Sequence, residues 1–170
     1  MSRTILETPR LYLREITRDD LDFIAAMTGD AEVMRYYPQV LDRAGAQAWL
    51  ERTLWRYSTD GVGFWLVVDR TTNEPRGQVG VLMQEVDGVR ETEVGYMIHR
   101  PYWRQGIATE AAAACHEYVF RTLERPRVIA LVRPVNIPSQ ATARGLSMAV
   151  EKRTMFKDYE HDVFVKHRAT

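Results

Sequence analysis

A strand, a loop and a helix near the middle of the chain contain the residues best suited to bind an anion. Residues 93–98 have the β-prone composition of a strand, and the chain from Ala108 onward is rich in alanine, which favours a helix. The loop between them contains Pro101 and a single glycine, Gly106. The first turn of a helix leaves backbone N–H groups without acceptors, and the helix dipole adds partial positive charge there. The pattern therefore predicts a phosphate site, although a purely structural loop would have the same pattern.

The same loop excludes two common classes of nucleotide site. It lacks the Gly-x-x-x-x-Gly-Lys-Ser/Thr pattern of nucleoside-triphosphate hydrolysis and the Gly-x-Gly-x-x-Gly pattern of dinucleotide folds. One glycine before an alanine-rich helix does not by itself say which phosphate compound would bind.

Hydrophobic periodicity along the chain predicts a mixed α/β (α+β) domain. Alternating polar and apolar residues indicate a strand over residues 10–14, and a continuous apolar run indicates a central strand over residues 64–68. Asp87-Gly88 is a strong hairpin signal. The other expected strands cover residues 78–85, 91–98, 127–132 and two segments between 148 and 165, and the expected helices cover about 18–28, 43–57, 108–123 and 136–144. This order predicts one domain over residues 1–170, with a mostly antiparallel sheet of six to seven strands and about four helices.

Composition narrows the class of protein. The formal net charge is zero, which argues against a general nucleic-acid or membrane-surface binder, because such proteins need a strong basic footprint. No apolar run approaches transmembrane length, and the N-terminus lacks a signal-peptide core, so we expect a cytoplasmic protein. The single cysteine, Cys115, allows no internal disulfide, and no spacing of His, Asp or Glu suggests a metal site. We expect His161 to be a surface residue.

The loop residues resemble a known family in detail. The segment Pro-Tyr-Trp-Arg-Gln-Gly-Ile-Ala-Thr-Glu-Ala, residues 101–111, closely resembles the acetyl-CoA loop of the GNAT superfamily of N-acetyltransferases. That motif is Gln/Arg-x-x-Gly-x-Gly/Ala. Trp103 takes its first position, a variant of the RimJ/RimL-like (ribosomal-protein N-terminal acetyltransferase-like) group, while Gly106 and Ala108 fill the two small positions. The segments Thr8–Arg14 and Glu93–Tyr96 and the pair Asn136-x-x-Ser139 agree with the resemblance, which covers nearly the whole chain.

The resemblance implies acetyl-CoA as the acetyl donor and no metal. It implies a GNAT-like sheet in which the strand ending near Ile98 splays from the strand beginning near Arg127, with the pantetheine arm in the gap, pairing with the free backbone edge. Backbone N–H groups of residues 104–109 would bind the pyrophosphate, and the small residues Gly106 and Ala108 would leave room for it. The cofactor-binding residues implied are Met97, Ile98, His99, Trp103, Arg104, Gln105, Gly106, Ile107, Ala108, Thr109, Asn136 and Ser139.

The resemblance also implies direct transfer to an amine in a ternary complex, without an acyl-enzyme. Glu93 is the first candidate for the general base and Asp158 the second, each with an alternative as an ordinary strand or turn residue. Ser139 matches the position that protonates the thiolate and Asn136 a pantetheine contact, although both also suit helix N-capping. Cys115 lies on the apolar stripe of its helix, so we expect it to be packed in the core.

The acceptor is the part of the function that the sequence leaves open. Family members often have Leu-Gly-Phe where this chain has Leu146-Ser147-Met148, so acceptor preference transfers less safely than cofactor binding. The early aromatic residues Tyr36, Tyr37, Trp49 and Trp55 suit either an acceptor cleft or the core. The expected acceptor is a primary amine, on a protein N-terminus or a small molecule.

Two alternatives remain at this stage. One is a non-catalytic acyl-CoA-binding module on the same fold. The other is an antibiotic- or polyamine-detoxifying acetyltransferase, which an acidic cleft would favour, but Asp19, Asp20, Asp30 and Glu32 are too scattered to decide. Either a monomer or a homodimer is compatible with the resemblance.

Overall fold

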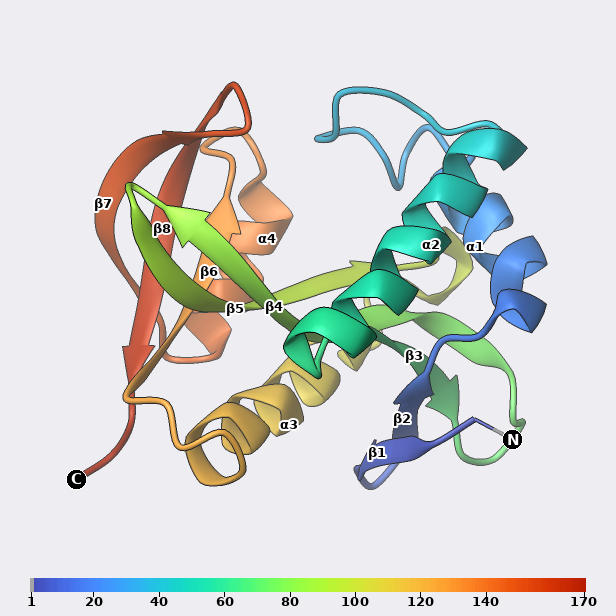
Figure 1. The fold of residues 1–170 in the computed structure, drawn as a ribbon, viewed down its shortest axis with the longest axis horizontal. Helices are drawn as coiled ribbons and strands as arrows, with labels where there is room; N and C mark the ends of the chain where they lie inside the picture. The colour runs from blue at the N-terminus through green and yellow to red at the C-terminus, as the bar shows by residue number, and fades with distance from the viewer. Residues whose placement is uncertain (1) are drawn as a thin grey trace.

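The computed structural model describes residues 2–170 and contains one twisted sheet with helices on both faces (Figure 1). Over these residues the sheet has eight strands in the order β1-β2-β3-β4-β5-β6-β8-β7. The strands are β1 (Thr4–Glu7), β2 (Leu11–Glu15), β3 (Phe64–Asp69), β4 (Pro75–Val86), β5 (Val89–Ile98), β6 (Arg127–Val132), β7 (Ala149–Phe156) and β8 (Tyr159–His167). The helices are α1 (Leu21–Thr28), α2 (Arg43–Asp60), α3 (Ile107–Arg121) and α4 (Ile137–Gly145), with short 3-10 turns η1 (Arg18–Asp20) and η2 (Arg100–Tyr102).

The fold class is confirmed, and the strand count is one higher than the upper limit expected. The additional strand is β1, a four-residue strand at the edge that pairs with β2 in antiparallel fashion. A run of four residues is too short to establish a period of two, so the sequence pattern did not reveal it. All adjacent strands pair antiparallel except β5 and β6.

Strands β5 and β6 separate along part of their length, as expected. Strand β5 pairs with β4 from Val89 to Ile98, but its parallel pairing with β6 is limited to Glu93 opposite Ile129. The backbone edge of β5 that follows Glu93 therefore has no strand partner on that side. This free edge is the feature of the sheet that positions the candidate site.

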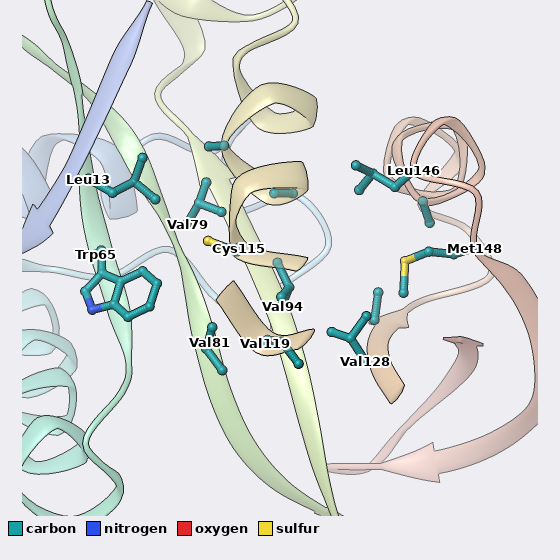
Figure 2. Close-up of a cluster of buried hydrophobic side chains, with 14 of the residues drawn as sticks. Leu13, Trp65, Val79, Val81, Val94, Cys115, Val119, Val128, Leu146 and Met148 are labelled. Atoms are coloured by element: carbon teal, nitrogen blue, oxygen red, sulfur yellow. The ribbon is translucent and has the colours of Figure 1, made fainter. Parts of the chain in front are cut away.

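Helix α3 packs closely against the face of the sheet opposite α1 and α2. Figure 2 shows Cys115 and Val119 of α3 directed towards Val79, Val81 and Val94 of the sheet. Alternate residues of β3 contribute to both faces, since Trp65 and Val67 belong to this cluster while Leu66 and Val68 pack with α1 and α2. The alternation reflects the period of two along a strand.

Cys115 is a core residue, as expected. It has no exposed surface, and burial raises the pKa of its thiol, so no thiolate is available at neutral pH. The adjacent His116 is also buried, and burial lowers its pKa to about 4, which leaves the imidazole neutral. Within residues 2–170, no cluster of His, Cys, Asp or Glu is arranged to hold a metal ion, and no helix is long and apolar enough to cross a membrane.

Candidate active site

A cavity of about 910 Å³ opens where β5 and β6 part. Its walls come from β5, β6, the loop before α3, the α1–α2 loop, α2 and the β7–β8 turn. Figure 1 shows that the α1–α2 loop and the β7–β8 turn lie at the same end of the molecule, at the top of the view. The part of the cavity beside the α3 loop is called the cofactor half below, and the part around Glu93 the acceptor half.

The loop before α3 presents free backbone N–H groups to the cofactor half. Gly106 precedes the helix with φ 75°, a left-handed conformation that glycine adopts at little cost. The first α-helical hydrogen bond runs from the Glu110 N–H to the Gly106 carbonyl, at 3.0 Å. The N–H groups of Ile107, Ala108 and Thr109 lie before that bond and have no helical acceptor. All three residues line the cavity, so the loop can hold an anion.

Two anchors hold this loop in place. The indole N–H of Trp103 donates a 2.7 Å hydrogen bond to the carbonyl of Ile98, which ties the loop to the end of β5. The carboxylate of Glu110, in the first turn of α3, accepts hydrogen bonds from the Thr8 hydroxyl and from Nε of Arg10. The segment before β2 and the anion loop are thereby joined, although they lie about 100 residues apart in sequence.

Most of the expected cofactor residues border the cavity. The residues that do are Met97, Ile98, Trp103, Arg104, Gly106, Ile107, Ala108, Thr109, Asn136 and Ser139. His99 and Gln105 do not line it. The His99 ring packs edge-on against Phe23 at 5.5 Å, and its backbone N–H donates to the Arg76 carbonyl at 2.9 Å. The His99 amide is therefore already used within the protein.

Ser139 contacts both Asn136 and Tyr96 beside the gap between β5 and β6. The Asn136 side chain accepts a 3.1 Å hydrogen bond from the Ser139 N–H, so it caps α4 while it borders the cavity. The Tyr96 hydroxyl lies 2.9 Å from the Ser139 hydroxyl and 3.0 Å from the Ser139 carbonyl oxygen. Burial raises the pKa of Tyr96, which keeps its hydroxyl protonated.

Glu93 lies at the junction where the two strands part. One carboxylate oxygen accepts a 3.1 Å hydrogen bond from the Gln84 side chain, and the other accepts a 3.1 Å bond from the Leu131 N–H. Because Leu131 donates to this carboxylate rather than to a carbonyl of β5, the Glu93 side chain takes the place of strand pairing. Burial raises the pKa of Glu93 above its ordinary value, against the opposing effects of these hydrogen bonds and of Lys157 and Arg56.

Asp158 lies outside the cavity. It is exposed in the two-residue turn between β7 and β8, and its neighbours Lys157 and Tyr159 line the cavity instead. Contrary to expectation, His161 also lines the cavity, with its ring 5.5 Å from that of Phe156. The alternation along β8 brings Tyr159 and His161 to the same side.

The acceptor half contains aromatic residues from three separate segments. Tyr37 of the α1–α2 loop packs edge-on against Trp49 of α2 at 6.0 Å, and Trp49 stacks on Phe64 of β3 at 6.3 Å. Tyr36 also lines the cavity, whereas Trp55 is 60% exposed and does not. Tyr37 itself is 37% exposed.

Ser147 occupies the position where related sequences often have glycine. It adopts φ 65°, a left-handed conformation that is strained for a residue with a side chain. Met148, which follows it, is buried in the main core. Relative to Leu-Gly-Phe, this chain therefore has a side chain in a strained turn at Ser147 and a different core side chain at Met148.

Comparison with known proteins places the chain in a family. A family model described as the acetyltransferase (GNAT) domain matches residues 10–149. The chain belongs to this family. It is 32% identical over 152 residues to the uncharacterized protein YkkB of Bacillus subtilis (strain 168), covering 89% of this chain and 88% of that protein. It is also 32% identical over 161 residues to the uncharacterized N-acetyltransferase YoaA of the same organism, covering 91% of this chain and 87% of YoaA.

The fold is shared with solved structures of the family. The structure of RimL, a ribosomal L7/L12 α-N-protein acetyltransferase, in complex with coenzyme A superposes with a TM-score of 0.79 at 15% identity, covering 97% of this chain and 98% of RimL. At that identity the likeness concerns the fold alone. The assignment to the GNAT acetyltransferase family rests on the family model.

Proposed function

We propose that the protein transfers an acetyl group from acetyl-CoA to a primary amine by direct attack in a ternary complex. The observation that carries this proposal is the continuity of one cavity from the free N–H groups of α3, along the unpaired edge of β5, to the Glu93 carboxylate. Membership of the GNAT family supports it.

The cofactor half has the chemistry required for coenzyme A. The N–H groups of residues 104–109 and the dipole of α3 would bind the pyrophosphate. The edge of β5 at Met97 and Ile98 has no strand partner and would pair with the amide groups of the pantetheine arm, in the manner of an added strand, beside the Ile98 carbonyl that accepts the Trp103 indole N–H. Asn136 and Ser139, on the far side of the gap, would contact the end of that arm.

The acceptor half supplies the proton transfers. Acetyl-CoA brings the acetyl group as a thioester, which is activated for attack. Glu93 takes a proton from the amine, directly or through a water molecule, and its raised pKa brings it closer to the working pH of a general base. The amine nitrogen forms a bond to the carbonyl carbon as the carbon–sulfur bond breaks. The departing thiolate takes a proton through the Ser139 hydroxyl, which regains a proton from solvent water in the cavity, and the Tyr96 hydroxyl beside it positions that group.

The experiment that tests this function is a thiol-release screen on the purified protein. Acetyl-CoA is supplied together with peptides of varied N-terminus, amino acids, polyamines and aminoglycosides, and free thiol and acetylated product are measured. Acetyl-CoA binding is measured separately by calorimetry. We expect binding together with amine-dependent thiol release. Binding without release across the whole panel would indicate a non-catalytic acyl-CoA-binding module, and absence of binding would contradict the proposal altogether.

A further inference from the structure

The acceptor half carries more positive than negative charge. Five cationic side chains border it: Arg35, Arg52, Arg56, Arg133 and Lys157. Glu32 and Glu93 are the carboxylates that line the cavity among residues 2–170. Over the same residues, Arg56 alone of the five cations has a carboxylate within 4.0 Å, that of Asp60. The Arg133 guanidinium donates a 3.1 Å hydrogen bond to the Tyr36 carbonyl. Among residues 2–170, Arg35, Arg52 and Lys157 therefore remain available to a ligand.

Lys157 and Arg56 lie at the Glu93 end of the cavity, away from the α3 loop that would bind the pyrophosphate. From Glu93 to its last residue, Ile98, strand β5 extends over about 17 Å, at about 3.3 Å per residue. The charges of Lys157 and Arg56 both act on Glu93, which places them at its end of the strand. Partial burial and the charges of Arg56 and Arg52 lower the pKa of Lys157, although Glu93 opposes them. The cations therefore repel one another at close range.

The backbone at Lys157 gives a second, independent indication. Lys157 and Asp158 form a two-residue hairpin turn with φ 48° and 70°. The β4–β5 hairpin has a similar geometry at Asp87 and Gly88, with φ 50° and 78°, and there uses a favoured residue pair. A lysine at such a position has an unfavourable conformation that asparagine or glycine would avoid. Lys157 lines the cavity, and its backbone conformation in this turn costs conformational energy.

The wall beside the cations is aromatic. Tyr37 packs edge-on against Trp49, Trp49 stacks on Phe64, and the Arg52 guanidinium lies 5.7 Å from the centre of the Trp49 ring. An aromatic wall next to cations without carboxylate partners suits a compact molecule with an acid group and an apolar body.

We propose that the acceptor is a small amine with a carboxylate or phosphate group a few bonds from its nitrogen, the amine meeting Glu93 and the acid group meeting Lys157 and Arg52. This inference rests on the proposed function. A purely cationic amine would be repelled by the cleft, whereas an amine with an acid group carries no net positive charge. The same cations disfavour the protonated amine, which assists its deprotonation by Glu93.

The first test compares matched amines that differ in the acid group. Phenylalanine is compared with phenylalanine amide for the carboxylate, and O-phosphoethanolamine with ethanolamine for the phosphate. Thiol release is measured as kcat/KM on the intact protein. We expect the acid-bearing member of at least one pair to react about tenfold or more faster, because a charged hydrogen bond contributes about 1.5–3 kcal/mol. The pair with the larger ratio identifies the acid group.

The second test removes the cations one at a time. Arg52→Gln and Lys157→Gln should each reduce the ratio of kcat/KM between the acid-bearing amine and its neutral partner. Arg125→Gln is the matched control, because it removes one exposed positive charge outside the cavity. That control should leave both values unchanged.

A binding measurement separates this inference from the proposed function. Calorimetry compares N-acetylphenylalanine with N-acetylphenylalanine amide on the coenzyme A-saturated protein, which requires no turnover. Tighter binding of the acid, lost in Lys157→Gln, supports the inference. Equal turnover within both the carboxylate pair and the phosphate pair, with equal binding of acid and amide, would overturn it while leaving the acetyltransferase function intact. Turnover restricted to peptides, or to polyamines, would also overturn it. Failure of every amine to release thiol would instead contradict the proposed function.

Discussion

The two halves of the cavity are built in different ways. The cofactor half consists mainly of backbone: the N–H groups of Ile107, Ala108 and Thr109 and the unpaired edge of β5. These groups come from one continuous stretch of chain. The acceptor half consists of side chains, and it brings together the α1–α2 loop, α2, β4, β5 and the β7–β8 turn. A site made of backbone constrains residue size and helix position, whereas a site made of side chains is free to vary in charge and shape. The difference explains how one fold can keep its acetyl donor and change its acceptor.

The largest expected effect concerns the group at the boundary of the two halves. Glu93→Gln should lower kcat by about 100- to 10,000-fold, the usual range for loss of a general base. The affinity for acetyl-CoA, measured by calorimetry, should stay unchanged because the cofactor half is intact. Glu85→Gln is the matched control, since this exposed carboxylate also lies in the β4–β5 hairpin but does not border the cavity. Near-normal turnover in Glu93→Gln would remove Glu93 from the role of base.

The pH dependence of kcat/KM tests the same role of Glu93. Burial raises the pKa of Glu93, and the base acts only when deprotonated. As the pH falls through this raised pKa, kcat/KM should decline, and it should do so at a higher pH than an exposed glutamate would give. This decline at low pH should be absent from the residual activity of Glu93→Gln and present in Glu85→Gln. A decline that persists in Glu93→Gln would assign the titration to another group.

A smaller effect, on acetyl-CoA affinity, tests the cofactor half alone. Gly106→Ala should weaken acetyl-CoA binding by about tenfold, because it forces a side chain into a left-handed position beside the phosphate site. Gly88→Ala is the matched control, because Gly88 has φ 78°, close to the 75° of Gly106, but lies in the β4–β5 hairpin. Both variants should lose about 1 kcal/mol of stability, and only the first should lose affinity. Equal acetyl-CoA affinity in the two variants would contradict the assignment of the loop.

The smallest expected effect concerns stability in the acceptor half. Lys157→Asn should raise the melting temperature by about 2 °C, because asparagine tolerates the left-handed turn better than lysine does. The same variant should lower the preference for acid-bearing amines. A melting temperature below that of the unmodified protein would show that Lys157 stabilises the turn, and would remove the argument from conformational cost.

The parts of the structure that follow local rules were predictable. The loop and helix from Trp103 onward, the Asp87-Gly88 hairpin and the buried position of Cys115 all depend on periodicity, capping and turn chemistry within a short window. The splay of β5 from β6 was predictable only through resemblance to a family. The hydrogen bond that lies at this point, from the Leu131 N–H to the Glu93 carboxylate, joins residues 38 positions apart, which no local pattern reveals.

The sequence by itself determined most of the secondary elements and the anion loop before α3, whereas the type of cofactor followed from the resemblance to a family. These features follow from the order of neighbouring residues, because helix ends and tight turns form within a few residues. Only the tertiary structure decided which side chains face the acceptor. Tyr37, Arg52, Lys157 and His161 border the same cavity because strand pairing and helix packing bring distant segments together. The charge of the acceptor half is a sum over those segments, and no local pattern in the chain contains it.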